Sequence, residues 1–430
     1  MKKGEKFVIQ GLAGRRKLNG TIQVNGAKNA VLKALAATIL FKDKVTLKNV
    51  PDIEDVSRTL DLLEDLGVGV ERNGMSISCD PRSINKNTLN KKISQQLRAS
   101  IVLTGPVLAR TGRVVFPHPG GCVIGARPID SFVEAFKKMG ASVKRKNGSY
   151  VIEAGGGKLK GAEIFFKNQS VTGTETFMMA AVLARGKTVL KNAALEPEIK
   201  HLADFLNSCG ARISGAGTPT IEIQGGSLLS SGKKVYTTPP DRIEAGTFLI
   251  LGALCAKHLE ITHCDPTHLE SLITTLEESG INIDTKKSSI VVECTGVKKC
   301  NMRSFDIKTH EYPGFPTDLQ APMTVYLTQA HGEGSVFETI FENRLGYTEE
   351  LSRMGADMTL MDTHRVLVRG PRSLRGREME SPDLRAGLAF VIAAITAKGE
   401  SVIHNVYNID RGYENIEDRL RKIGVSIVRN

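Results

Sequence analysis

Six copies of one pattern run through this chain, and the repetition constrains its fold more than any other feature of the sequence. Each copy consists of the apolar end of a helix, a glycine, and a segment in which apolar and polar residues alternate. A glycine in that place is typical of a helix C-terminus, where the chain turns into a left-handed conformation. The glycines lie 69 to 75 residues apart, at Gly67, Gly140, Gly210, Gly280, Gly355 and Gly424.

A second element alternates with the first. It is an alanine-rich helix followed by an alternating strand, as at 34–50, 180–193 and 391–406. Helices so rich in small apolar residues fit a position buried among other helices, and the alternation is typical of half-buried strands. Each unit of about 70 residues therefore holds two helices and several strands. The pattern predicts an α/β protein with its sheets outside and its helices inside.

Six units divide into three plus three. Pro239 and Pro240 stiffen the segment 237–242, which is the predicted crossover between two lobes. An earlier crossover is expected near 25–30, because the first predicted strands (7–24) precede the first helix. We therefore expect one lobe of three repeats at 28–239 and a second at 1–27 plus 240–430. A cleft between two similar lobes is a common place for a ligand site.

The charge balance favours an anionic partner. Lysine and arginine outnumber aspartate and glutamate by 58 to 46, a net charge of +12, which suits nucleic acid, an acidic surface or a phosphorylated small molecule. Aromatic residues make up only 5% and tryptophan is absent, which disfavours stacking on single-stranded nucleic acid. No membrane helix is expected, because the longest apolar run, 386–397, is shorter than the ~20 residues that a membrane span needs.

Cysteine usage points to a reducing compartment. The seven cysteines are an odd number and include no Cys-x-x-Cys pair. Neither a disulfide framework nor a structural zinc site is expected, and the N-terminus has no apolar core of signal-peptide length. These features predict a cytoplasmic protein.

One cysteine lies in an unusual place. Residues 117–128 read PHPGGCVIGARP, so Cys122 is surrounded by prolines and glycines that favour a loop. A structural cysteine behaves as a small buried apolar residue, which is not what a loop of this composition offers. The glycines permit a mobile lid, and Arg127 gives it an anionic target.

Nine motifs in this chain, taken in order, resemble the enolpyruvyl transferase family. They are NGAKNA, LRASI, PGGCVIGARPID, EPEI, PDRIEAGTF, FPTDLQAP, ETIFENR, DLRAGLA and IDRGYENIED, and they span essentially the whole chain. The resemblance implies a two-lobed inside-out α/β barrel of six repeated units. It also implies transfer of the enolpyruvyl group of phosphoenolpyruvate to the 3′-hydroxyl of UDP-N-acetylglucosamine with release of phosphate, the first committed step of peptidoglycan precursor synthesis. That chemistry needs no cofactor and no metal.

The resemblance assigns the phosphoenolpyruvate side of the site to basic residues. A planar guanidinium suits both phosphate and carboxylate, although any single arginine taken alone is more often a solvated surface residue. Arg344 and Arg385 are expected to close the site from the C-terminal lobe. Phosphoenolpyruvate and the closing loop are assigned to Lys28, Asn29, Arg98, Arg127 and Arg411. The residues expected to be catalytic are Cys122, Asp318, Lys28 and Arg411.

Asp318 has two interpretations. It follows a proline-bearing loop and opens an apolar helix, which is a frequent setting for a helix N-cap. The resemblance instead makes it the group that handles the 3′-hydroxyl proton. By the same resemblance, the nucleotide is contacted by Ser170, Val171, Thr172 and Ile340, and its uracil by Arg127, Pro128, Ile129, Asp130 and Ser131. Phe132 departs from the family, which commonly has histidine there.

Two other functions stay open from the sequence. One is the related transfer to shikimate 3-phosphate, and the other is a basic RNA-binding or RNA-end-processing protein built on related repeats. The loop cysteine and GARPID favour the sugar-nucleotide branch, so we expect small-molecule substrates and no nucleic-acid or membrane partner. The segment 262–268 gathers His263, Cys264, Asp265 and His268 but lacks further paired ligands for a metal. The pattern makes no prediction of the oligomeric state.

Overall fold

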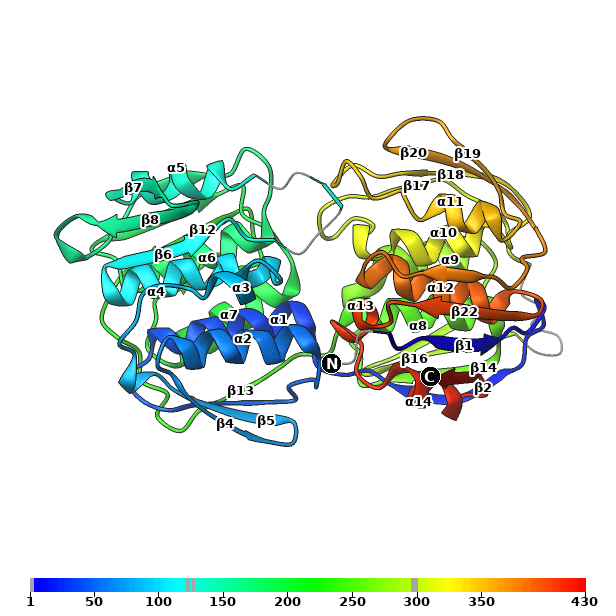
Figure 1. Ribbon diagram of the computed structural model, residues 1–430, viewed down its shortest axis with the longest axis horizontal. Coiled ribbons are helices and arrows are strands. Elements are labelled where there is room, and N and C mark those ends of the chain that lie inside the picture. Colours follow the sequence, from blue (N-terminus) through cyan, green and yellow to red (C-terminus); the bar gives the residue numbers. More distant parts are fainter. Residues whose placement is uncertain (1–3, 121–123, 126–127, 295–300) are drawn as a thin grey trace. The chain divides into compact units, whose positions relative to one another are not determined.

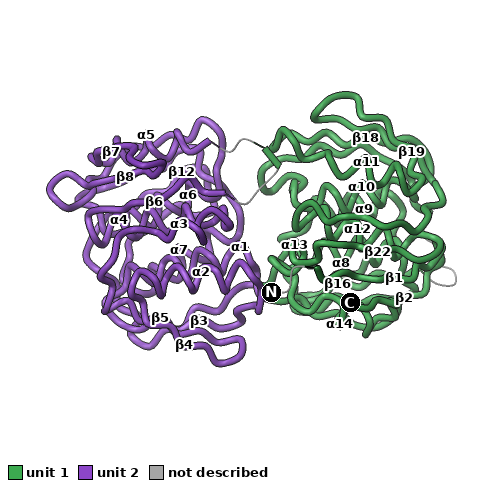
Figure 2. The backbone as a smooth tube through the Cα atoms, in the orientation of Figure 1, with its two compact units in different colours: residues 1–25, 123–126, 240–430 green, residues 26–122, 127–239 purple. Residues whose placement is uncertain are grey.

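The computed structural model describes residues 4–120, 124–125, 128–294 and 301–430, and the chain forms two compact units (Figures 1 and 2). Unit 1 comprises residues 1–25, 123–126 and 240–430, and unit 2 comprises 26–122 and 127–239. The boundaries expected from the sequence were 27/28 and 239/240; those of the units lie at 25/26 and 239/240. Ile124 and Gly125, in the cysteine loop, group with unit 1, whereas the sequence analysis placed the whole loop in the other lobe.

Three small sheets are formed by the described residues of unit 1. Their strand orders are β21-β22-β1-β23, β15-β16-β14-β2 and β17-β18-β20-β19. The strands are β1 (Phe7–Gln10), β2 (Leu18–Gln23), β14 (Ala256–Thr262), β15 (Ile283–Lys286), β16 (Ser289–Glu293), β17 (Ile307–Lys308), β18 (Gly332–Phe337), β19 (Asp357–Leu360), β20 (Arg365–Gly370), β21 (Glu378–Glu380), β22 (Glu400–His404) and β23 (Ser426–Arg429).

Unit 2 repeats this arrangement, with described strands in the orders β13-β3-β5-β4, β6-β8-β7 and β11-β12-β10-β9. The strands are β3 (Val45–Lys48), β4 (Gly69–Asn73), β5 (Ser76–Asp80), β6 (Arg113–Pro117), β7 (Ala141–Lys146), β8 (Ser149–Ala154), β9 (Glu163–Phe165), β10 (Lys187–Lys191), β11 (Ile213–Ser214), β12 (Thr220–Gln224) and β13 (Val235–Thr237).

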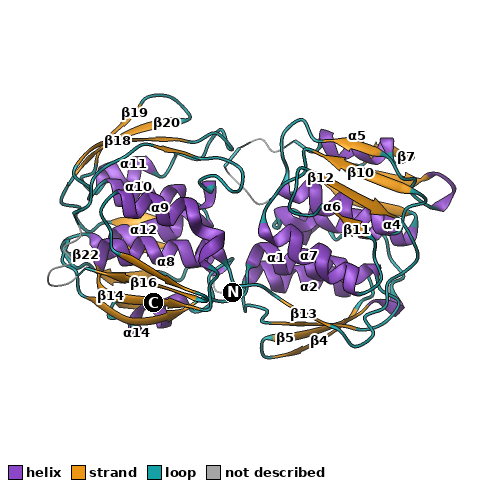
Figure 3. Ribbon diagram, turned by 180° about the vertical axis from the view of Figure 1, so that it is seen from behind, coloured by secondary structure: helices purple, strands orange, loops and turns teal. Residues whose placement is uncertain are grey.

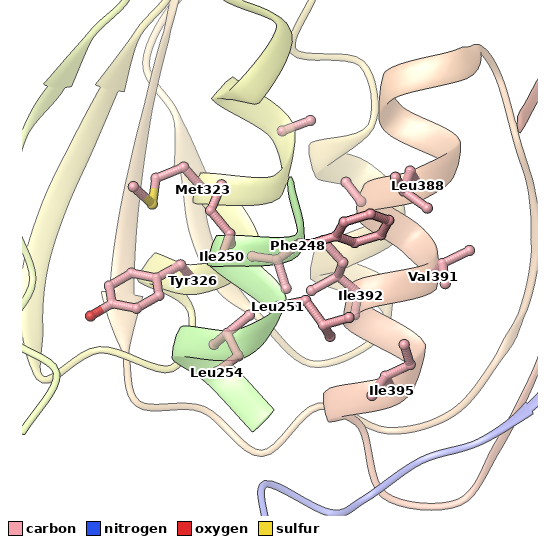
Figure 4. Close-up of a cluster of buried hydrophobic side chains, with 14 of the residues drawn as sticks. Phe248, Ile250, Leu251, Leu254, Met323, Tyr326, Leu388, Val391, Ile392 and Ile395 are labelled. Carbon is pink, nitrogen blue, oxygen red and sulfur yellow. The ribbon is translucent and has the colours of Figure 1, made fainter. Parts of the chain in front are cut away.

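Six largely buried helices form the interior of the two units, three in each, and strands lie at the periphery of each unit (Figure 3). They are α1 (Lys28–Ala37), α4 (Thr104–Thr111), α6 (Val171–Val182), α8 (Arg242–Cys255), α10 (Gln320–Leu327) and α12 (Leu384–Thr396). Every residue of α12 is buried. Phe248 and Leu251 of α8, Leu388 and Ile392 of α12 and Tyr326 of α10 belong to one buried cluster in the core of unit 1 (Figure 4). The α/β class, with sheets outside and helices inside, is confirmed.

A second helix in each repeat covers the flank of a sheet. These helices are α2 (Glu54–Asp65), α5 (Asp130–Lys138), α7 (Pro197–Ser208), α9 (Glu270–Glu278), α11 (Thr348–Arg353) and α14 (Ile416–Lys422). Short helices complete the described chain: α3 (Lys91–Ser94), α13 (Tyr407–Asp410), η1 (Thr38–Leu40), η2 (Pro81–Ser83), η3 (Arg98–Leu103), η4 (Gly155–Gly157), η5 (Pro266–Leu269) and η6 (Thr317–Leu319).

The six repeat glycines terminate these flanking helices in the left-handed conformation. Their φ angles lie between +81° and +106°, a region in which an L side chain is strained. Each glycine follows the helix C-cap by one residue, as Gly210 follows Cys209 after α7. The sequence prediction of helix C-terminal glycines is therefore confirmed.

The N-terminal strands complete sheets of unit 1. β1 lies between β22 and β23 and is antiparallel to both, and β2 runs parallel to β14. At the other crossover, β13 runs parallel to β3 and completes a sheet of unit 2. The first and last segments of the chain thus belong to one unit.

Cysteine usage differs from expectation at one position. Cys294, directly after β16, is disulfide-bonded, although the sequence predicted a chain of free thiols. Four other described cysteines are free and buried: Cys79, Cys209, Cys255 and Cys264. Across the described residues, we found no helix with the length and hydropathy required to cross a membrane.

Candidate active site

Unit 1 brings together three of the residues that the sequence assigned to the site. Asp318 lies in η6, just before α10, and its Oδ1 accepts a hydrogen bond from Nη2 of Arg344 at 2.7 Å. Its Oδ2 lies 3.0 Å from Nη2 of Arg385 and accepts from Nε of that residue at 3.1 Å. Both guanidinium groups are buried while the Asp318 side chain is 26% exposed. One carboxylate is therefore held between two desolvated cations by charge-assisted hydrogen bonds.

The helix-cap interpretation of Asp318 is wrong. The N-cap of η6 is Pro316 and that of α10 is Leu319, and neither helix end receives a side-chain hydrogen bond. Asp383, by contrast, caps α12 by accepting from the backbone N–H groups of Arg385 and Ala386. Asp318 uses its oxygens for the arginines.

Two further residues, Thr317 and Glu338, orient Arg344, and the sequence analysis did not single them out. Thr317 accepts from Nη1 of Arg344 at 2.7 Å and donates to Oε2 of Glu338 at 2.7 Å. The fully buried Glu338 also accepts from the backbone N–H of Ile340 at 2.8 Å, so it sets the position of the segment expected to contact the nucleotide. Glu338 is the first residue of the motif ETIFENR, and that motif was the sequence signal that could have identified it.

Tyr413 is a third residue that the sequence analysis missed. Nη1 of Arg385 lies 2.8 Å from its hydroxyl, and the ring is buried. Burial raises the pKa of the Tyr413 phenol, so the group stays neutral and fixes the arginine without adding a charge. Arg411 follows α13 two residues earlier and is half-buried. Its neighbour Asp410 is bound by Arg429 at 2.7 Å, which anchors this end of the chain.

Unit 2 places Lys28 and Asn29 in the first turn of α1. The ammonium of Lys28 lies 2.7 Å from Oδ2 of the buried Asp55, in the first turn of α2. Asn29 is half-buried, and its carbonyl accepts a hydrogen bond from Nζ of Lys33 at 2.6 Å. The start of α1 is therefore held by the side chains of Asp55 and Lys33.

Arg98 begins η3 and donates from Nη1 to the carbonyl of Pro119 at 3.1 Å. Pro119 belongs to the predicted cysteine loop, so this contact ties the arginine to the start of that loop. Cys122 and Arg127 themselves lie outside the described residues.

Apart from Ile340, which follows β18 in unit 1, the residues expected to contact the nucleotide lie at two helix starts of unit 2. Ser170 is the N-cap of α6 and accepts from the N–H of Gly173 at 3.0 Å. Half-buried Val171 and Thr172 begin the same helix. The uracil stretch leads into α5: Pro128, Asp130 and Ser131 are exposed, and Ile129 is buried.

The departure at Phe132 has a packing reason. Phe132 is buried and its ring centroid lies 5.7 Å from that of Phe177 in α6. It thereby fastens the start of α5 to α6 through an aromatic contact.

A metal site at 262–268 is not supported by the geometry. Asp265 caps η5 by accepting from the N–H of Thr267, and it lies 3.6 Å from His268. Among the residues that the structure describes, no group of three or more histidine, cysteine, aspartate or glutamate side chains is arranged to bind a metal ion.

Comparison with known proteins agrees with the resemblance seen in the sequence. UDP-N-acetylglucosamine 1-carboxyvinyltransferase from Acidobacterium capsulatum is 45% identical over 99% of this chain and 96% of its own length. The protein of the same name from Solibacter usitatus is 43% identical over 99% of both.

Solved structures show the same fold at low identity. The enolpyruvyl transferase NikO from Streptomyces tendae superposes with a TM-score of 0.85 at 21% identity, covering 100% of this chain and 99% of its own. EPSP synthase from Acinetobacter baumannii gives a TM-score of 0.73 at 18% identity, covering 99% of this chain and 100% of its own.

A family match covers nearly the whole sequence. The family described as EPSP synthase (3-phosphoshikimate 1-carboxyvinyltransferase) matches residues 12–420, a span that includes every candidate site residue discussed above. The chain therefore belongs to the EPSP synthase (3-phosphoshikimate 1-carboxyvinyltransferase) family.

Proposed function

We propose that this enzyme transfers the enolpyruvyl group of phosphoenolpyruvate to the 3′-hydroxyl of UDP-N-acetylglucosamine and releases phosphate. The observation that carries the proposal is the Asp318 carboxylate held between Arg344 and Arg385 in a chain 43–45% identical, over 99% of its length, to relatives named for this transfer. The step supplies a precursor of peptidoglycan.

The reaction divides into an addition and an elimination. In the addition, the 3′-oxygen bonds to C2 of phosphoenolpyruvate, Asp318 takes the hydroxyl proton, and Cys122 delivers a proton to C3. In the elimination, C3 loses a proton, the bond from C2 to the phosphate oxygen breaks, and the double bond between C2 and C3 returns. Both carboxylate and phosphate stay anionic throughout, so basic side chains are needed at each step.

The basic side chains divide by unit. In unit 2, Lys28, Asn29 and Arg98 would bind phosphoenolpyruvate, together with Arg127. In unit 1, Arg385 and Arg411 would offset the charge of the reacting groups, and Arg344 would orient Asp318. The nucleotide would be bound by Ser170, Val171, Thr172 and Ile340 and by the stretch from Pro128 to Ser131.

Phosphate release tests the proposal directly. The purified enzyme is given phosphoenolpyruvate with UDP-N-acetylglucosamine, with shikimate 3-phosphate, or with no acceptor, and inorganic phosphate is measured with time. We expect phosphate release only in the reaction that contains both phosphoenolpyruvate and UDP-N-acetylglucosamine. Release with shikimate 3-phosphate instead would assign the chain to the other branch of the family, and no release with either would reject both.

A further inference from the structure

Unit 2 contains a buried lysine that the reaction described above does not use. Lys33 lies on the face of α1 that packs into the core, and its side chain is 7% exposed. Its ammonium lies 3.3 Å from Oε2 of Glu175 in α6, a side chain with no exposed surface. Burying an ammonium and a carboxylate is costly in free energy, and an apolar pair of similar size is often as stable or more so. The pair is therefore not explained by stability.

The pair joins two helices at the turns that carry candidate binding residues. Nζ of Lys33 also donates to the carbonyl of Asn29 at 2.6 Å, one turn back along α1. Glu175 is the fifth residue of α6 and lies one turn after the start that Ser170 caps. A single ammonium thus connects the turn that bears Asn29 to the start of the helix expected to bind the nucleotide.

More acidic groups surround this contact. Glu196 and Glu198 lie at the start of α7, both buried, and both raise the pKa of Glu175. Buried Tyr236 of β13 also interacts with Glu175 and Glu198. Glu175 therefore has one amine and two further carboxyl groups near it, and neither of its oxygens accepts a hydrogen bond from the described residues by geometry. Burial first, then these neighbours, raise the pKa of Glu175 to about 8, with Lys33 opposing the shift.

We propose that Lys33 and Glu175 are positioning residues that hold the first turns of α1 and α6 in register. The proposal rests on the proposed function, because it assigns the aligned turns to the two substrates: Lys28 and Asn29 to phosphoenolpyruvate, and Ser170 to Thr172 to the sugar nucleotide. Neither residue of the pair touches substrate; each acts through the backbone of the helix that bears it.

Kinetics on an apolar double variant separate positioning from stability. Lys33→Met with Glu175→Leu removes both charges and fills the same space, so the fold is retained. If the pair only stabilises the core, the variant has the wild-type KM for phosphoenolpyruvate. At pH 8.5, where Glu175 is ionised, we expect that KM to rise on the order of tenfold with kcat changed less, because residues in contact are energetically coupled. The single variant Lys33→Arg keeps the cation, so its KM should be close to that of the wild type.

A matched surface pair serves as the control. Lys200 and Asp204 form an ion pair of 2.7 Å on α7 of the same unit, with both side chains about 60% exposed. Lys200→Met with Asp204→Leu should leave the KM unchanged, because a solvated pair of this kind contributes little.

The pH dependence provides a second readout. The ratio of KM in Glu175→Gln to KM in the wild type should be near 1 at pH 6.5, where Glu175 is protonated and resembles glutamine. The ratio should rise to several-fold above pH 8.5, where the wild type alone gains a carboxylate to hold Lys33. The ratio cancels the titration of the substrates and of Cys122.

Hydrogen exchange keeps the proposal testable without turnover. The peptide covering residues 26–33 should exchange faster in the Lys33→Met, Glu175→Leu variant and at the wild-type rate in the control. If the wild-type enzyme releases no phosphate, the proposed function fails. The exchange result alone then decides whether Lys33 and Glu175 hold the two helices in register. Wild-type exchange in this peptide, or a KM ratio that stays near 1 at every pH, would overturn the proposal.

Discussion

Two arginines fix the carboxylate of Asp318, and a substitution at this residue can distinguish a catalytic role from a structural one. Asp318→Asn keeps the size of the side chain but cannot take a proton from the 3′-hydroxyl. We expect kcat to fall at least ~100-fold, the usual scale for a general base, with the thermal midpoint little changed. Asp357→Asn is the matched control, because Asp357 is also bound by two arginines, Arg369 and Arg372. An Asp318→Asn enzyme with wild-type kcat would show that Asp318 only anchors the arginines.

Cys122 is expected to differ chemically from the buried thiols. Burial raises the pKa of Cys79 to about 12 and that of Cys255 and Cys264 to about 11, so these side chains are poor nucleophiles. Fosfomycin should therefore alkylate Cys122, as family resemblance implies, and peptide mapping by mass spectrometry locates the modification. Cys122→Ser should lose most activity, whereas Cys122→Asp, which keeps an ionisable acid, should retain some and resist fosfomycin. Alkylation of Cys264 with Cys122 intact would contradict this assignment.

Glu175 makes stability depend on pH. Its pKa is raised from 4.5 to about 8 in the folded chain, so the folded state binds the proton more tightly than the unfolded state does. The stability from this proton is complete below pH 4.5 and is lost as pH rises through about 8. Between about pH 5 and 8 the thermal midpoint of the wild type should fall more steeply than that of Glu175→Gln. Glu163→Gln, at an exposed partner of Lys191, should follow the wild-type curve.

At the scale of helices and strands, the repeat glycines set where each flanking helix stops. Gly210 has φ +106° and no atom within 4 Å of an added Cβ, so Gly210→Ala adds strain in the backbone alone. We expect a loss of about 1 kcal/mol, read from the urea midpoint. Gly226 of the same unit has similar room, with its nearest atom at 3.9 Å and no left-handed φ. Gly226→Ala should be neutral or slightly stabilising, and an equal loss in both variants would reject the conformational explanation.

The elements were predictable from sequence because each repeats the same local chemistry. Glycine at a helix end and alanine in a packed helix leave a signal within a few residues, and both were identified correctly. The contacts of Asp318 were harder to predict from the sequence, because its position suggested a helix cap. Arg344 and Arg385 are 26 and 67 residues away along the chain, and only the fold brings them to Asp318. Glu338 and Tyr413 were missed for the same reason. The disulfide bond of Cys294 had no sequence signal.

For the whole molecule, the units differ in how the chain builds them. Unit 2 is nearly continuous, since all strands of its sheets lie between residues 26 and 239. Unit 1 needs residues 1–25, because β1 is an interior strand between β22 and β23. We expect a fragment of residues 26–239 to unfold cooperatively when monitored by circular dichroism. A fragment of residues 240–430 should be unfolded until a peptide of residues 1–25 is added, and cooperative unfolding without the peptide would contradict this view.

The interior position of β1 also bears on how the protein is made on the ribosome. β1 is synthesised long before its neighbours β22 and β23. At a translation rate of about 5–20 residues per second, roughly 20–80 s separate their emergence. Unit 2 can fold during that interval, whereas Phe7 and Ile9, which are fully buried in the finished protein, have no sheet to enter. The nascent chain therefore carries an unprotected apolar strand during that interval, and we expect general chaperones to bind there.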